Sequence, residues 1–164
     1  MSEKMWAGGI FKEVDENSFS FTGKFDIITA PNLTLKITQK HPGDAEMLLF
    51  YYSDIINPAN QVIGNIRIRI GHNFHSYYNG HIGYKIFEEY RGNGYAYKAC
   101  QMALDIVRYH NMDFIYFACD ESNIASYKTI EKLGAKLVEI CDVPKEYFAW
   151  REGMERRRIY KLDL

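Results

Sequence analysis

The chain has 164 residues, and its 20 basic side chains nearly balance its 21 acidic ones. This length fits about one domain with a sizeable core, and the near-zero net charge gives no overall field that would attract nucleic acid. No run approaches the roughly 18 apolar residues that a membrane-spanning helix needs, and residues 1–4 are not followed by the apolar segment of a secretion signal. We therefore predict a single domain over residues 1–164 that is cytoplasmic, with neither a membrane nor a nucleic acid as partner.

The residues before position 33 give the weakest pattern. Four apolar residues alternate loosely with polar ones, namely Phe19, Phe21, Phe25 and Ile27. This favours a hairpin that turns near residues 22–24, although an irregular N-terminal cover explains the pattern equally well. Residues 33–38 alternate clearly between apolar and polar, which predicts a strand with one buried face.

Two further strands are expected before the middle of the chain. Residues 46–56 are nearly all apolar or aromatic, and their Phe, Tyr and Ile content favours a buried strand over a helix. After a turn at residues 57–60, residues 62–70 alternate again. One face carries Ile66, Ile68 and Ile70, and the other carries Arg67 and Arg69. Together with residues 33–38, these segments predict an antiparallel meander.

Residues 71–81 are polar and aromatic, which predicts a surface loop. The loop contains His72, His75 and His81, but their spacing matches no zinc pattern, and no cysteine or carboxylate is near them. We therefore predict no metal site, and expect the histidines to form hydrogen bonds or to contact a substrate. The three cysteines, Cys100, Cys119 and Cys141, do not have the spacing of metal ligands, and we expect them to be buried, reduced thiols.

The centre of the chain combines a strand, a glycine-rich turn and a helix. Residues 82–87 are mostly apolar and suit a strand, and a helical face at steps of three and four is formed by Tyr95, Ala99, Met102, Ala103, Ile106 and Val107. The turn between them leads directly into a helix N-terminus, whose unpaired amide N–H groups and positive dipole end favour phosphate. Gly92 and Gly94 let the backbone approach a ligand closely, and Arg91 adds a positive charge.

The last third continues with alternating strands and helices. A strand at residues 114–119, a helix at 123–133 that ends before Gly134, and a strand at 135–140 are expected. Residues 155–163 alternate enough for a final strand, which includes an Arg156–Arg158 run. We interpret this run as a solvated strand edge rather than a nucleic-acid patch. The whole pattern predicts a mixed α/β fold, with helices packed on a twisted sheet.

Two motifs narrow the kind of phosphate site. The turn matches neither a nucleoside-triphosphate loop nor a dinucleotide-binding fingerprint. Instead, Arg-x-x-Gly-x-Ala, carried by Arg91, Gly94 and Ala96, resembles the pyrophosphate loop of the GNAT acyl-CoA N-acyltransferases. Residues 123–126 and 130–135 resemble the second helix of that family and its terminating glycine, most closely in the branch of ribosomal-protein N-terminal alanine acetyltransferases.

The resemblance implies the GNAT fold, in which a mostly antiparallel, twisted sheet has splayed central strands and flanking helices. It also implies acetyl-CoA as cosubstrate, without a metal. The expected contacts to the pantetheine arm are the backbone of Tyr84, Lys85 and Ile86, together with Asn123 and Ser126. The expected contacts to the diphosphate are Arg91 and the amides of Gly92, Asn93, Gly94, Tyr95, Ala96 and Tyr97. Asn123 is equally suited to cap the helix that follows it.

The implied reaction is attack of an amine, on a small molecule or a protein N-terminus, on the thioester carbonyl. Many members of the family have a proton-donating tyrosine seven residues after the asparagine, but this position is Ile130, which cannot donate a proton. Ser126 or a water is expected to replace it. Glu88 is one candidate base, and the other candidate acid–base groups are Glu89, Asp120, the histidines of residues 71–81, Tyr127 and Tyr147.

Two alternatives to an enzyme follow from the same residues. The missing tyrosine is compatible with a catalytically silent module that binds CoA and acts as a sensor or interaction domain. The Arg156–Arg158 run is compatible with an interaction domain whose binding weakens steeply with salt. A homodimer is compatible with the resemblance as well.

Overall fold

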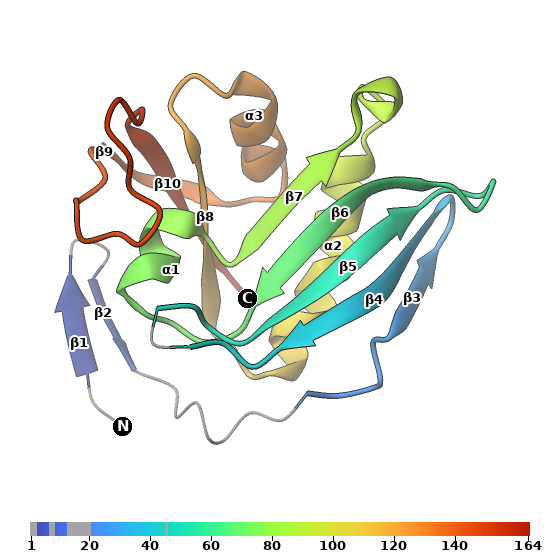
Figure 1. Cartoon of the computed structure of the whole chain (residues 1–164), viewed down its shortest axis with the longest axis horizontal. Coiled ribbons are helices and arrows are strands. Elements are labelled where there is room, and N and C mark those ends of the chain that lie inside the picture. Colours follow the sequence, from blue (N-terminus) through green and yellow to red (C-terminus); the bar gives the residue numbers. More distant parts are fainter. Residues whose placement is uncertain (1–2, 7–8, 13–20, 45) are drawn as a thin grey trace.

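The computed structural model describes residues 3–6, 9–12, 21–44 and 46–164 (Figure 1). Within these residues the elements are β1 (Glu3–Trp6), β2 (Gly9–Lys12), β3 (Ile27–Ala30), β4 (Leu33–His41), β5 (Phe50–Ile56), β6 (Val62–Arg69), α1 (Phe74–Asn79), β7 (Ile82–Ile86), the 3-10 helix η2 (Glu88–Tyr90), α2 (Tyr95–Tyr109), β8 (Phe114–Asp120), α3 (Ile124–Lys132), β9 (Lys136–Cys141) and β10 (Arg157–Asp163). None of the helices in these ranges is long and apolar enough to cross a membrane.

The larger sheet has the strand order β3-β4-β5-β6-β7, and every neighbouring pair in it is antiparallel. The predicted meander of β4, β5 and β6 is therefore confirmed, although β5 begins at Phe50 rather than near residue 46. The first arm of the hairpin predicted near residues 22–24 lies largely outside the described residues, so the hairpin stays a prediction, although the amide of Asp26 does donate to the carbonyl of Gly23 at 3.2 Å. Strand β3 folds back onto β4 through Asn32, which has the left-handed φ of 67° that asparagine tolerates. Phe19 lies outside the described residues.

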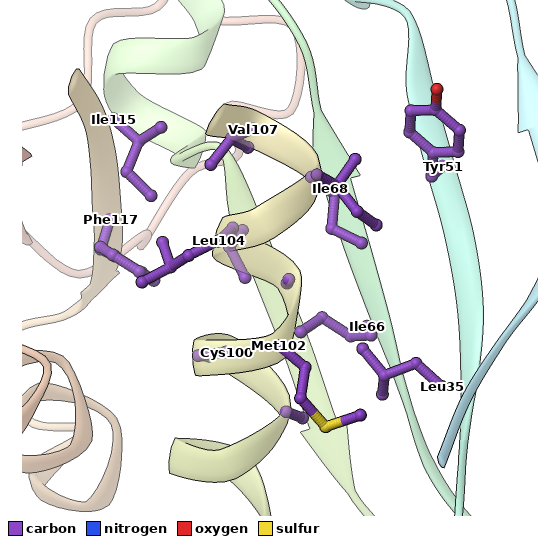
Figure 2. Close-up of a cluster of buried hydrophobic side chains, with 14 of the residues drawn as sticks. Leu35, Tyr51, Ile66, Ile68, Cys100, Met102, Leu104, Val107, Ile115 and Phe117 are labelled. Carbon is purple, nitrogen blue, oxygen red and sulfur yellow. The ribbon is translucent and has the colours of Figure 1, made fainter. Parts of the chain in front are cut away.

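Helix α2 packs across one face of this sheet and also contacts the smaller sheet, β8-β10-β9 (Figure 1). Figure 2 shows Leu104 and Val107 of α2 between Ile68 of β6 on one side and Ile115 and Phe117 of β8 on the other. The predicted apolar face of the helix thus forms the core. Burying each large aliphatic side chain of this kind contributes about 1.5–3 kcal/mol to stability, so α2 fixes the positions of both sheets.

The prediction of a surface loop at residues 71–81 is wrong, because α1 forms within it. The Asn73 side chain accepts the amide N–H of Ser76 at 2.7 Å, and the Ser76 hydroxyl reaches back to the amide of Asn73 at 3.0 Å. This reciprocal capping box starts a helix in a segment whose polar composition suggested a loop. His72 and His81 are also buried rather than exposed.

His81 joins the two sheets at the point where β7 begins. Its backbone N–H donates to the carbonyl of Tyr116 in β8 at 2.7 Å. Its ring Nδ1 accepts the amide N–H of Tyr116 at 2.8 Å, so Nε2 carries the proton that binds the carbonyl of Gly71 at 2.7 Å. From this contact β7 runs toward the glycine turn and β8 runs toward α3, so the two strands are parallel (Figure 1). Beyond the contact the two strands diverge. The splayed central strands predicted from the family resemblance are present.

The buried histidines make the fold sensitive to acid. Burial lowers the pKa of His81 well below its ordinary value of 6.5, and that of His72 to about 4. Below pH 6.5 the unfolded chain therefore binds protons that the folded chain excludes, and the free energy of unfolding falls as the pH falls. At about 1.4 kcal/mol per pH unit, His72 alone accounts for a loss of about 2 kcal/mol between pH 6.5 and pH 5.

Denaturant unfolding at a series of pH values from 7.5 to 5 measures this loss. A His72→Phe variant should show a shallower dependence on pH over the same range. Stability that does not change between pH 7 and pH 5 would contradict the burial of neutral histidines.

Candidate functional site

The turn between β7 and α2 is braced by its own side chains. Gly92 and Gly94 have φ values of 82° and 74°, a backbone conformation that other residues rarely adopt. The Asn93 side chain donates to the carbonyl of Tyr90 at 3.0 Å, and Arg91 Nε donates to the carbonyl of Ile86 at 2.9 Å. The turn is therefore fixed to the end of β7 before any ligand binds.

This turn leaves a row of amide N–H groups without partners. Lys98 is the first residue of α2 whose amide N–H donates a helical hydrogen bond, which goes to the carbonyl of Gly94 at 3.2 Å. Within the described ranges, no acceptor binds the amides of residues 92–97. A Cβ built on Gly92 or Gly94 would meet no atom of the described residues within 4 Å. The amides and the positive end of the α2 dipole thus face open space that suits an anion.

A cavity of about 610 Å³ lies in front of this turn, between β7 and α3. Ten of the residues predicted from the sequence line it, namely Tyr84, Lys85, Ile86, Arg91, Gly92, Gly94, Tyr95, Ala96, Tyr97 and Asn123. The other three, Asn93, Ser126 and Glu88, do not line it. The Asn93 side chain is turned back onto the backbone of the turn, and Glu88 is exposed on η2.

Strand β7 presents alternate backbone groups to the cavity. Arg69 and Phe87 donate their amides across the β6–β7 ladder, so the odd-numbered residues of β7 use their N–H and C=O groups to pair with β6. The N–H and C=O groups of Tyr84 and the N–H group of Ile86 therefore point into the gap between β7 and β8, whereas the Ile86 carbonyl accepts Arg91 Nε. The backbone groups of Lys85 pair with β6, and only its side chain is left to face a ligand.

Sequence reasoning missed five residues that line the cavity, which are Tyr90, Ala125, Lys128, Thr129 and Lys132. Four of them lie on one face of α3 at steps of three and four. The helix predicted from the sequence, together with the contact expected at Asn123, could therefore have identified them as lining residues. Lys128 and Lys132 join Lys85 and Arg91 to give the cavity four cationic side chains, and its lining includes no carboxylate among the described residues. This charge pattern suits a ligand with several phosphate groups.

Asn123 begins α3 as a capping residue. Its side-chain oxygen accepts the amide N–H of Ser126 at 3.2 Å, which satisfies one free donor of the helix end. The side-chain NH₂ of Asn123 is left to face the cavity. The Ser126 side chain is half-buried beside the cavity rather than in its wall.

The phenol of Tyr84 is a polar group that sequence reasoning left without a role. Its oxygen is buried, and burial raises the pKa of Tyr84 well above its usual range. The hydroxyls of Ser126 and Thr129 on α3 lie beside it, but no group in the described part of the chain reaches hydrogen-bonding geometry with it. The oxygen therefore lacks a partner at the base of the gap between β7 and α3. Ile130, where many family members carry a tyrosine, is 2 % exposed.

Several of the candidate bases are engaged elsewhere. Asp120 pairs with Arg157 at 3.0 Å, and the Tyr147 ring is buried behind β10. His72 and His81 lie in the interior rather than at the cavity. None of these groups is placed to take a proton from an amine at the cavity.

The arginine run on β10 is also engaged within the chain. Arg156 forms a two-point ion pair with Glu121 at 2.7 and 3.0 Å, and Arg158 lies 4.3 Å from the centre of the Tyr127 ring. With Arg157 bound to Asp120, all three guanidinium groups hold β10 to β8 and α3. Among the described residues, no group of three or more His, Cys, Asp or Glu side chains could hold a metal ion.

Comparison with solved structures gives the fold. An acetyltransferase from Agrobacterium tumefaciens str. C58 superimposes with a TM-score of 0.60 at 18% identity, over 89% of this chain and 96% of that one. The ribosomal-protein-S5-alanine acetyltransferase from Vibrio fischeri matches with a TM-score of 0.56 at 22% identity, over 70% and 61%. The Microcin C7 self immunity acetyltransferase MccE, solved in complex with acetyl-CoA and AMP, matches with a TM-score of 0.55 at 15% identity, over 70% and 61%.

The chain spans only 61–65% of the length of several of these neighbours, including a GNAT-family acetyltransferase from Bacillus anthracis. No curated protein sequence matches the chain. The family model described as the acetyltransferase (GNAT) domain matches residues 32–136, which is more than half of the chain. The chain therefore belongs to the GNAT acetyltransferase family, as the two sequence motifs predicted.

Proposed function

We propose that this protein transfers an acetyl group from acetyl-CoA to a primary amine on a small molecule or a protein N-terminus. One observation carries the proposal. The cavity of about 610 Å³ combines the free amides of the glycine turn with four cationic side chains, and it extends along β7 and α3. A long ligand with a diphosphate at one end and a thioester at the other fits this arrangement. The complex of MccE with acetyl-CoA supports the choice of ligand.

In the proposed mechanism the chain acts mainly by positioning. The amides of residues 92–97 bind the diphosphate, and the backbone N–H and C=O groups of Tyr84 bind the pantetheine arm as an added strand would. The Ile86 amide then lies where it can donate to the thioester carbonyl as negative charge develops on its oxygen. Holding the amine against that carbonyl supplies on the order of 7–11 kcal/mol at best. Water is proposed to take the proton from the amine, because the candidate carboxylates do not reach the cavity.

The Tyr84 hydroxyl is proposed to donate a hydrogen bond to the leaving thiolate, in place of the tyrosine that Ile130 replaces, while the proton that completes the thiol comes from water. We expect Tyr84→Phe to lower kcat by about 100-fold, in the range of losing one donor that stabilises developing charge, with KM for acetyl-CoA changed less than about twofold. Tyr97→Phe is the matched control, because it removes a hydroxyl from the same cavity that accepts a hydrogen bond from the exposed Gln101 side chain. Steady-state release of free thiol measures both. Equal turnover in the two variants would exclude the Tyr84 hydroxyl as the donor to the thiolate.

Thermal unfolding with acetyl-CoA tests the proposed function. A hundredfold excess over the dissociation constant should stabilise the chain by about 2.7 kcal/mol. No shift at millimolar acetyl-CoA would contradict the proposal. A shift without thiol release across a panel of amines would favour the catalytically silent CoA-binding module.

A further inference from the structure

Two arginines lie on the face of the larger sheet opposite α2. Arg67 and Arg69 alternate with the buried Ile66 and Ile68 along β6, so both point away from the core. They line a second, smaller cavity of about 60 Å³, which is separate from the one in front of the glycine turn. The other walls come from residues 46–48, β5, α1 with its capping residue, and the chain after β9.

Both guanidinium groups are withdrawn from water. The centre of the Arg67 guanidinium lies 5.1 Å from the Phe50 ring centroid and 5.5 Å from that of Tyr52. Its Nε is buried and has no hydrogen-bond partner. Arg69 Nη1 donates to the carbonyl of Gly80 at 3.1 Å, and burial, together with the charge of Arg67, lowers the pKa of Arg69 to about 10.

No counter-charge balances this pair. Within the described ranges, no carboxylate lies within 4 Å of either arginine, and Glu46, which also lines the small cavity, forms no ion pair with them. Two adjacent cations that are partly removed from water are unfavourable unless an anion joins them. The planar guanidinium fork fits a carboxylate, which it can bind through two parallel hydrogen bonds.

The small cavity lies next to the strand that borders the thioester gap. Arg67 is paired with Gly83 of β7, and a Cβ at Gly83 would lie 3.6 Å from Arg69 Nη1. Because Gly83 has no side chain, the Arg69 guanidinium can lie against its backbone, next to Tyr84 on the same strand. A molecule that places an anion at the arginines is therefore one strand away from the gap.

We propose that Arg67 and Arg69 bind a carboxylate of the amine acceptor, so that the preferred substrates are amines that also carry an acidic group. The assignment of the carboxylate to an acceptor depends on the proposed acetyl transfer. The presence of an anion site at the two arginines is independent of acetyl transfer, so a direct binding measurement tests the site first.

Isothermal titration with succinate, at an ionic strength held constant with NaCl, should give saturable binding to the wild-type chain, in the presence or absence of acetyl-CoA. Arg67→Gln should weaken this binding at least tenfold, and Arg67→Lys, which keeps the charge but loses the fork, should weaken it less. Lys36→Gln, an exposed change on β4, is the control and should bind as the wild type does. Without succinate, Arg67→Gln should unfold at the same temperature as the wild type or higher, because it removes an unbalanced charge.

Turnover then identifies the source of the carboxylate. Lysine should be acetylated with a higher kcat/KM than cadaverine, which is lysine without its carboxylate, and Arg67→Gln should bring the ratio close to one. Succinate binding that does not saturate, or that is equal in Arg67→Gln and the wild type, overturns the anion site even if acetyl-CoA still binds. Saturable succinate binding with no preference between lysine and cadaverine overturns its assignment to the acceptor. Failure to bind acetyl-CoA with succinate binding intact contradicts the proposed function and leaves the anion site in place.

Discussion

Gly94→Asp is expected to abolish CoA binding. Gly94 forms the N-terminal cap of α2 with a φ of 74°, and a side chain there would project into open space in front of the free amides. Two unit charges about 4 Å apart at an effective dielectric constant near 20 repel each other by about 4 kcal/mol. The carboxylate should therefore weaken binding of the diphosphate by about 1,000-fold, which isothermal titration with CoA measures directly.

Gly153→Asp is the matched control for this prediction. Gly153 also has a positive φ, of 78°, and a Cβ there would meet no atom within 4 Å in the part of the chain that the structure describes, but it does not line the cavity. Both variants therefore introduce the same charge and similar backbone strain. Equal CoA affinity in the two variants would place the diphosphate somewhere other than the glycine turn.

His81→Phe is expected to destabilise the fold by about 2–5 kcal/mol. The phenylalanine ring fills a similar volume, but the amide N–H of Tyr116 and the carbonyl of Gly71 lose their partners. Each buried polar group left unsatisfied costs about 1–3 kcal/mol. Because these bonds hold β7 to β8 at the start of the gap, the variant should also bind acetyl-CoA less tightly.

His75→Phe provides the comparison for denaturant unfolding. His75 is half-buried, and its ring accepts one amide N–H, from Phe148, at 3.2 Å near the surface. The same substitution should therefore cost less than about 1 kcal/mol there. If the two variants have similar stability, His81 does not join the sheets in the way its contacts indicate.

Local patterns were enough to predict the elements around the site. The apolar alternation of β4 and β6, the helical face of α2 and the glycine after α3 depend on neighbouring residues, and each is confirmed. The family resemblance rested on the same local features, since the turn at residues 91–96 and the start of α3 are short, continuous segments. The structure places most of their residues around one cavity.

What was missed depends on contacts between distant segments. The Tyr84 phenol was given no role, because its burial requires α3, more than forty residues further along the chain. His81 resembled a loop residue, because its partner Tyr116 lies 35 residues away. Helix α1 was mistaken for a loop because its capping box uses Ser76 as the second member, where glutamate or glutamine is usual.

A crystal structure of the complex with acetyl-CoA tests the central claim most directly, namely that the free amides of the glycine turn bind the diphosphate and direct the thioester into the gap between β7 and β8. We predict diphosphate oxygens within about 3.2 Å of amide nitrogens among residues 92–97, and the acetyl group beside Ile86. A cofactor bound elsewhere on the chain, with those amides facing only solvent, would contradict the claim.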